Sequence, residues 1–230
     1  MDDLTADKFI EELKANSQPG GQKTSGFVED SGNPAQMIGV RMGTVFEIAK
    51  RFTKMPLTEV SRLLDSRFYE ARLGAVSIMD FQARKPKLTP EESAALFDLY
   101  LSKHERIDNW GLVDRAAPRV IGRHLEDKPR DILLQLAKSD RVSQRRTAIV
   151  APLWLITRKK EVDDALAVAE LLLEDKHELI HSALGATLHH VGSVDKAKLD
   201  EFLQKHHKKM SRTILRLATR QLPDLKKKYS

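Results

Sequence analysis

The pattern of apolar and polar positions is helical along almost the whole chain. Apolar residues recur at helical spacing from near Met37 almost to the end, and no run of alternating β-branched residues indicates a strand. Residues 4–15 form a separate short amphipathic pattern, and residues 16–34, rich in Gly, Ser, Gln and Asn, indicate a linker or loop. We therefore expect an all-α protein with an N-terminal helix and flexible linker over residues 1–34 and a helical-repeat domain over residues 35–230.

The helical segments come in pairs. First members begin near Pro56, Leu88, Pro129, Glu161 and Lys196, and second members cover residues 68–83, 110–124, 143–157, 178–191 and 211–222. The period of about 32 to 41 residues, with small residues such as Gly74 and Gly185 in the second members, is typical of stacked helix pairs. The pattern predicts a HEAT-like α-solenoid with a concave, partly basic groove.

Composition excludes several classes of protein. The chain has no cysteine, so it forms no disulfide and no thiolate metal site. No apolar run approaches the roughly 18 residues of a membrane-spanning helix, and no signal-peptide pattern opens the chain. We therefore expect a soluble, cytoplasmic protein with no membrane partner.

The net charge of +6 is concentrated near the C-terminus. Residues 195–230 hold 11 Lys and Arg against 4 Asp and Glu, whereas residues 1–194 hold 28 against 29. This basic region, which includes Lys208, Lys209 and Arg212, favours binding to a polyanion such as DNA or RNA. A solubilising helical cap with a basic tail explains the same charges equally well.

Residues 109–119 place one of only two tryptophans four residues ahead of an aspartate. At about 100° per residue, Trp110 and Asp114 share one face of a helix, along the edge of its apolar stripe. An indole and a carboxylate at one border of a groove would suit a chemical site. The alternative is a core aromatic residue beside a solvated acid.

Arg146 lies on the axis of its own helix's apolar stripe, and Arg146 and its neighbour Arg145 are candidate DNA-binding residues. A guanidinium in that position is either a buried salt-bridge partner or a phosphate clamp at the mouth of the stripe. Pro118 and Pro152 fall inside predicted helices, and each should kink its helix because it lacks an amide donor.

Three motifs together resemble the AlkD-type DNA alkylation-repair family, whose members are HEAT-like repeat DNA glycosylases. They are Asn-Trp-x-x-Val-Asp at 109–114, Gln-Arg-Arg-Thr-Ala-Ile at 144–149, and Ala-Leu-Gly at 183–185 followed by Leu188. The similarity runs over residues 37–192 in the family's order, and it suggests that residues 38–41 begin the first repeat.

The resemblance implies a glycosylase that removes cationic alkylated purines, such as N3-methyladenine and N7-methylguanine, from double-stranded DNA without needing to flip the base. It implies that Asp114 stabilises the oxocarbenium-like sugar and positions water, that Trp110 packs on the sugar, and that Arg146 holds a backbone phosphate. No metal and no cofactor are implied. We expect a monomer associated with the nucleoid.

The chain departs from the family at two positions. Where active members carry a second tryptophan after the Ala-Leu-Gly string, this chain has Ala186, and the arginine that usually follows is His189 here. Ala186 lies away from the core stripe of its helix, so the missing indole would have faced the groove. The sequence leaves open a weakened enzyme, altered lesion preference, or a non-catalytic relative that binds branched or damaged DNA.

A competing pattern is the pentapeptide at 177–181, a formal match to the zinc-protease signature H-E-x-x-H, in which His177 and His181 would bind zinc. The third histidine of the metzincin pattern is missing, and the match falls where a repeat's second helix should begin. Chance at a helix start is the simpler explanation. The pairs His189-His190 and His206-His207 are expected to be solvated or to face phosphate.

Two functions remain at this point. The first is a base-excision glycosylase for alkylated DNA, with Trp110, Asp114 and Arg146 as its site. The second is a non-catalytic helical-repeat module that binds nucleic acid or a protein partner.

Overall fold

A computed structural model describes residues 4–18 and 36–229. Over these ranges the chain is helical, with a single isolated bridge between Gln36 and Phe68 and no strand. The chain forms two compact units, unit 1 (Met1–His124) and unit 2 (Leu125–Ser230). The predicted all-α, helical-repeat fold is confirmed. The predicted division at residue 34 lies outside the described residues and stays a prediction, as does the concave groove.

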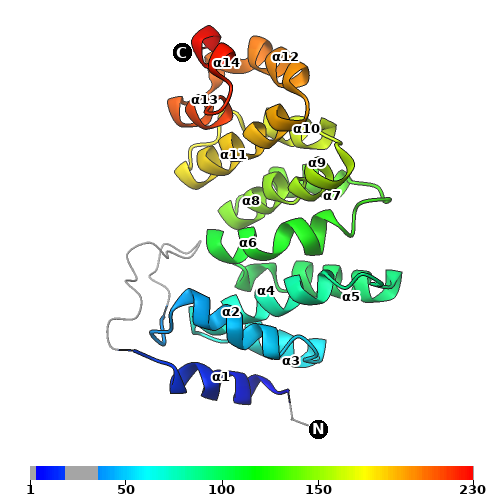
Figure 1. Ribbon diagram of the computed structural model, residues 1–230, viewed down its shortest axis with the longest axis vertical. Helices are drawn as coiled ribbons and strands as arrows, with labels where there is room; N and C mark the ends of the chain where they lie inside the picture. The colour runs from blue at the N-terminus through cyan, green and yellow to red at the C-terminus, as the bar shows by residue number, and fades with distance from the viewer. Residues whose placement is uncertain (1–3, 19–35, 230) are drawn as a thin grey trace. The chain divides into compact units, whose positions relative to one another are not determined.

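Unit 1 begins with α1, which lies at one end of the unit against α2 and α3 (Figure 1). A π-helical turn, η3, directly continues α6. The described helices of this unit are α1 (Ala6–Ala15), α2 (Met42–Arg51), α3 (Leu57–Leu64), α4 (Tyr69–Ala83), α5 (Pro90–Ser102), the short η2 (His104–Arg106), α6 (Trp110–Ala117) and η3 (Pro118–Gly122).

Unit 2 ends in three helices, α12 to α14, that gather at its C-terminal end (Figure 1). Its helices are α7 (Asp131–Ala137), α8 (Val142–Val150), α9 (Leu153–Lys159), α10 (Asp163–Leu172), α11 (Glu178–Val194), α12 (Lys196–His206), the short η4 (His207–Lys209), α13 (Arg212–Ala218) and α14 (Pro223–Tyr229).

The predicted helix pairs correspond to α3 with α4, α5 with α6, α7 with α8, α10 with α11, and α12 with α13. Each of the two prolines stands where an α-helical segment ends, and the predicted kinks stay a prediction. Pro118 ends α6, and the Arg123 amide donates to its carbonyl at 3.1 Å across the wider π turn. Pro152 separates α8 from α9, so the helix expected over residues 143–157 is two helices. Helix α2 lies in the region of predicted helical periodicity but in none of the five predicted pairs, and α14 was not predicted.

Glycines permit close helix packing at the two predicted positions. A Cβ atom at Gly74 of α4 would lie 2.2 Å from the ring of Phe9, which is fully buried in α1. A Cβ atom at Gly185 of α11 would lie 2.7 Å from Leu217 of α13. Each glycine therefore brings two helices closer than any other residue would allow.

The buried carboxylate of Glu70 holds the segment that precedes α2. It accepts hydrogen bonds from the backbone amides of Ile38, Gly39 and Val40 at 2.9, 2.8 and 3.2 Å, and Glu70 is 0% exposed. Gly39 adopts a φ of 97°, a conformation that favours glycine. A buried charge is tolerated when several donors satisfy it, so this site fixes the segment on the first turn of α4.

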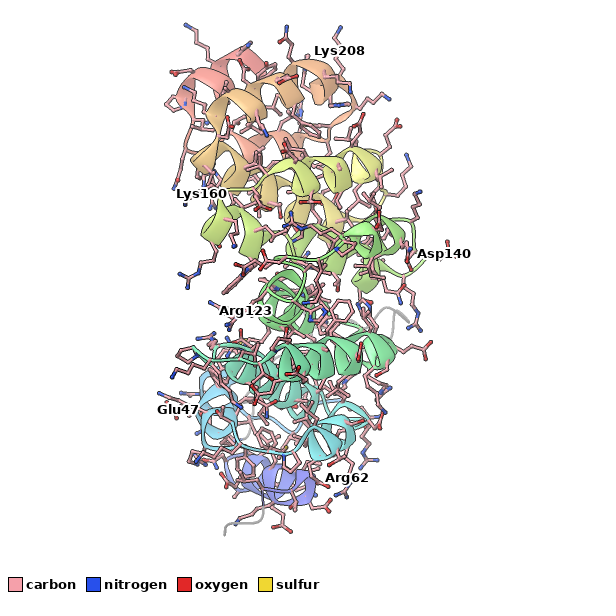
Figure 2. The ribbon with its side chains drawn as sticks, turned by 90° about the vertical axis from the view of Figure 1, so that its right-hand side faces the viewer. Glu47, Arg62, Arg123, Asp140, Lys160 and Lys208 are labelled. Atoms are coloured by element: carbon pink, nitrogen blue, oxygen red, sulfur yellow. The ribbon has the colours of Figure 1, made fainter. Side chains whose placement is uncertain are left out.

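Replacing Glu70 with Gln should destabilise the protein by about 2 to 3 kcal/mol, because the amide offers one acceptor oxygen to three buried amide donors. Urea unfolding followed by circular dichroism measures the loss. Glu47→Gln, at an exposed residue of α2, is the matched control and should change stability by less than about 0.5 kcal/mol (Figure 2). Equal stability of the two variants would contradict this role of Glu70.

Candidate functional site

The N-terminus of α6 presents the predicted pair Trp110 and Asp114. Asn109 caps the helix, and its side chain accepts a hydrogen bond from the Gly111 amide at 2.9 Å. Trp110 is half-buried and Asp114 is exposed. Val113, the residue directly before Asp114, is fully buried in the core, as the helical periodicity predicted. The indole and the carboxylate therefore border the exposed face of one helix.

A buried ion pair fixes the backbone just before this helix. Arg72 of α4 is 0% exposed, and its Nη1 donates to both carboxylate oxygens of Asp108 at 2.8 and 2.7 Å. The same nitrogen donates to the carbonyl of Arg106 at 3.4 Å. Asp108 is the residue directly before the N-cap Asn109, so the pair sets where α6 begins. Sequence analysis did not predict this pair, whose partners lie 36 residues apart.

The hydroxyl of Tyr69 lies beneath the first turn of α6. A Cβ atom at Gly111 would come within 2.5 Å of Tyr69 Oη, so a glycine is needed there. Burial, together with the negative charges of Glu70, Asp114 and Asp108, raises the pKa of Tyr69 well above its ordinary value. The tyrosine hydroxyl therefore remains protonated and neutral over the whole physiological pH range.

Three arginines converge on a second buried carboxylate of α4, Asp80, which is 0% exposed. Arg84, Arg115 and Arg119 reach its oxygens at 2.6, 3.1 and 3.2 Å. Arg115 and Arg119 lie one turn apart on α6 and η3. The sequence signal was an arginine at every fourth position, 115, 119 and 123, and sequence analysis missed it because the acid lies in another helix.

Arg146 has a contact within unit 2. It is 6% exposed, and its Nη1 donates to the carbonyl of Leu179 in the first turn of α11. Burial on the core side of α8 was one of the two predicted alternatives. The carbonyl of Leu179 is one of its partners. Arg146 and Asp114 belong to different units, and their convergence in one groove stays a prediction.

The neighbouring Arg145 connects α8 to the loop before α11. Its Nε donates to Asp175 at 2.6 Å, and its Nη1 donates to the carbonyls of Ser139 and Asp140 at 2.8 and 2.9 Å. With these donors satisfied by the protein, Arg145 has a structural role in unit 2. Its contact with DNA stays a prediction.

The two departures on α11 differ in exposure. Ala186 is exposed, so an aromatic residue at this position would have projected from the helix, in agreement with the sequence analysis. His189 is 5% exposed, and His206 in α12 is 7% exposed. The expectation that these two histidines are solvated is therefore wrong. Each contributes its ring to the interior of unit 2, and the role of His189 in DNA binding stays a prediction.

Two groups of basic residues near the C-terminus differ in their partners. Lys196, Lys198, Lys205 and Lys228 form ion pairs with Asp224, Asp163, Glu170 and Asp200. Lys208, Lys209 and Arg212 are exposed and form no ion pair with another described residue; Lys208 projects from the C-terminal end of unit 2 (Figure 2). The predicted DNA-binding cations of this region therefore remain accessible to a polyanion.

Comparison with known proteins decides the family. The family model of the DNA alkylation repair enzymes matches residues 9–222, nearly the whole chain. The chain belongs to this family. Its membership agrees with the resemblance carried by the Trp110–Asp114 motif and supports a role in the repair of alkylated DNA. No curated protein sequence matches the chain.

A solved structure shares the fold of this family member. The predicted DNA alkylation repair enzyme from Enterococcus faecalis superposes with a TM-score of 0.63 at 16% sequence identity, over 81% of this chain and 88% of that chain. At this identity the likeness concerns the fold alone, and it agrees with the stacked helix pairs of both units.

The histidines of the H-E-x-x-H match have other partners in this family member. His177 caps α11, where its Nδ1 accepts from the Leu179 amide at 3.2 Å, and His181 Nε2 lies 2.6 Å from the carbonyl of Asp175. The described residues contain no group of three or more His, Cys, Asp or Glu side chains placed to hold a metal ion. None of the described helices is long and apolar enough to cross a membrane.

Asp108→Asn should destabilise the protein by about 3 to 5 kcal/mol, because it removes the negative charge that both oxygens of Asp108 present to the fully buried Arg72 guanidinium. Thermal unfolding followed by circular dichroism measures the change. The matched control is Asp65→Asn, which removes an exposed ion pair with Lys103 (2.6 Å) and should cost at most about 1 kcal/mol. If Asp65→Asn lost as much stability as Asp108→Asn, the result would contradict the claim that the buried ion pair contributes more to stability than the exposed one.

Stability should fall in acid through the buried histidines. Burial first, and then the positive charge of Arg220, lowers the pKa of His189, and burial likewise lowers the pKa of His206. The folded protein thus binds these protons less readily than the unfolded chain, so the free energy of unfolding decreases as the pH falls below the unfolded pKa of about 6.5. Urea unfolding from pH 7.5 to 5 should show a shallower decrease for His189→Gln; identical slopes would contradict the assignment.

Proposed function

We propose that this protein is a DNA glycosylase that removes cationic alkylated purines, of the N3-methyladenine and N7-methylguanine type, from duplex DNA. The observation that carries the proposal is the exposed Asp114 carboxylate beside the half-buried Trp110 at the start of α6, in a chain of the DNA alkylation repair enzyme family. The reaction hydrolyses the bond between the base and C1′ of the deoxyribose. Water supplies the hydroxyl group and the base leaves.

The proposed reaction needs no general acid to protonate the leaving base. A cationic base is already a good leaving group, so it departs with the bonding electrons as a neutral molecule and needs no proton. Positive charge then develops on the sugar, where a carboxylate stabilises it by electrostatics and accepts the proton of the attacking water. Asp114 is the group proposed for this role, because it is exposed and anchored on a helix whose start is fixed.

Trp110 supplies the second part of the proposed site. It lies one helical turn before Asp114, so both side chains project from the same edge of α6. The face of an indole attracts a developing cation and packs against the apolar side of a deoxyribose. The neutral Tyr69 hydroxyl beneath the same turn limits how far this edge can move toward the core.

Phosphate contacts are proposed to come from basic residues of unit 2. Arg146 reaches the surface only with the 6% of its area that stays exposed, so its proposed contact is with a phosphate that approaches the first turn of α11. Lys208, Lys209 and Arg212 are proposed to add charge at the C-terminal end. Such contacts bind duplex DNA without reading its sequence.

A second function, binding of damaged or branched DNA without catalysis, is favoured by one observation. Ala186 is exposed at the position where active members of the family carry a second groove tryptophan. An alanine there provides no aromatic wall for the sugar. This alternative keeps the basic surface and predicts binding of DNA with no release of base.

Release of free 7-methylguanine from methylated duplex DNA under single-turnover conditions separates the two functions. Asp114→Asn should lower the rate constant by about 10²- to 10³-fold, the range for loss of one preorganised electrostatic group. Trp110→Ala should lower it about tenfold. Asp98→Asn, at an exposed aspartate of α5, is the matched control and should release base at the wild-type rate.

Binding to the same duplex is measured in parallel by fluorescence anisotropy. Asp114→Asn should bind at least as tightly as the wild type, because it removes a negative charge from the DNA-facing side. Tight binding by the wild type with no base release would contradict the glycosylase and support the second function. Absence of DNA binding even at low salt would contradict both.

A further inference from the structure

The arginines around Asp80 carry more positive charge than the carboxylate can neutralise. Three guanidinium groups, from Arg84, Arg115 and Arg119, share one buried acid, which leaves two positive charges in excess. The cluster is held within unit 1 by α4, α6 and η3. Like charges this close repel one another, and burial together with Arg84 and Arg119 lowers the pKa of Arg115.

Arg115 is packed against other side chains of unit 1, whereas Arg84 and Arg119 are more exposed to solvent. Arg115 donates from Nε to Ser77 Oγ at 3.1 Å and stacks over the rings of Phe46 and Phe81, with 4.5 and 4.9 Å to the centroids. Its side chain is 18% exposed, whereas Arg84 and Arg119 are 42% and 36% exposed. Arg115 therefore anchors the carboxylate, and the other two arginines present donors to solvent.

The side chains of Arg84 and Arg119 are held in position more firmly than that of an ordinary surface arginine. Each is tied to Asp80 through one nitrogen, and Arg84 also lies over the Phe81 ring, with 5.2 Å from Cζ to the centroid. A guanidinium has five N–H donors, so each arginine keeps donors for a second anion. Because the side chains are already ordered, binding an anion costs little conformational entropy.

We propose that Arg84 and Arg119, held in place by Arg115 and Asp80, form a binding site for the phosphodiester backbone of duplex DNA. The inference rests on the proposed function, to which it adds a contact surface in unit 1. A phosphate is the fitting ligand because its oxygens match the fork of a guanidinium and its charge offsets the excess around Asp80. A single carboxylate as counter-ion does not neutralise the site.

The position of the site on α6 relates it to Asp114. At about 100° per residue, Arg115 projects about 100° round the helix from Asp114, and the core stripe with Val113 lies on the other side of Asp114. Asp114 therefore lies between the core stripe and Arg115 round the helix, with Gly111, which contacts Tyr69 of α4, on the Arg115 side. A phosphate held by Arg84 and Arg119 fixes the duplex against the same helix that carries the proposed carboxylate.

The test is the salt dependence of binding to an unmodified duplex, measured by fluorescence anisotropy between about 50 and 300 mM NaCl. Each lost phosphate contact should reduce the slope of log K against log salt by about 0.9. Arg84→Gln and Arg119→Gln should each reduce it by about one, and the double variant by about two, with binding near 100 mM salt weakened about tenfold or more. An unmodified duplex keeps catalysis out of the measurement.

Two controls separate a phosphate contact from a change in fold or in total charge. Arg62→Gln removes one positive charge from α3, where Asp7 and Glu59 already neutralise the arginine at 2.9 Å each. Figure 2 shows Arg62 well away from Arg123, which lies four residues after Arg119 in the sequence. Arg62→Gln should keep the wild-type slope. Arg84→Lys with Arg119→Lys preserves the charge and should retain most of the slope, while circular dichroism verifies that each variant is folded.

The outcomes for the phosphate site and for the glycosylase differ. A double glutamine variant that is folded and keeps the wild-type slope overturns the phosphate site, whether or not the wild type releases base. A reduced slope in that variant, with the Arg62 control unchanged, supports the site even where Asp114→Asn and the wild type show no difference in base release. Absence of duplex binding by the wild type at 50 mM NaCl overturns the site together with the proposed function.

Discussion

The buried ion pair between Arg72 and Asp108 is the constraint on which the candidate site depends. A guanidinium with no exposure to solvent is stable only beside a counter-charge, so the chain between η2 and α6 has to place Asp108 against α4. Asn109 then caps α6, and Trp110 follows as its first residue. The direction of the Trp110–Asp114 edge thus follows from a contact made entirely inside unit 1.

Some charged residues of the described chain are buried and hold other segments in place, and others are exposed to solvent. Glu70 and Asp80 are buried acids of α4 that fix other segments, and Arg145 acts similarly in unit 2 through Asp175. Asp114 and Lys208, in contrast, are exposed. Because α4 carries both buried acids and Arg72, one helix organises the segment before α2, the start of α6 and the arginine cluster. The proposed chemistry lies on the neighbouring helix, which these anchors hold.

Much of the fold was predictable because helical periodicity is a local property. The helix pairs, the breaks at Pro118 and Pro152 and the close packing at Gly74 and Gly185 each follow from residues near in sequence. Helix α14 was missed because a short lysine-rich segment resembles a solvated tail. The histidine pairs were predicted to be solvated or to face phosphate; solvation is wrong for His189 and His206, because adjacent polar residues gave no sign that one ring of each pair turns inward.

The candidate site was predictable only in part. The four-residue spacing of Trp110 and Asp114 sufficed to place both on one edge of α6. The partners that hold this edge were not predictable, because Arg72 and Asp108 lie 36 residues apart and Asp80 and Arg119 lie 39 apart. Pairings at that distance depend on how repeats stack, which a single sequence does not specify. The motif spacing thus predicted the positions of Trp110 and Asp114, and the structure showed which residues hold their helix in place.

The most direct test of the central claim compares two bases in otherwise identical duplexes, cationic 7-methylguanine and neutral uracil, under single-turnover conditions. A site that relies on a carboxylate and an indole, with no acid for the leaving group, should release 7-methylguanine and leave uracil in place. Release of both bases at similar rates would contradict this account of the chemistry. Release of neither would contradict the assignment of catalysis to Asp114.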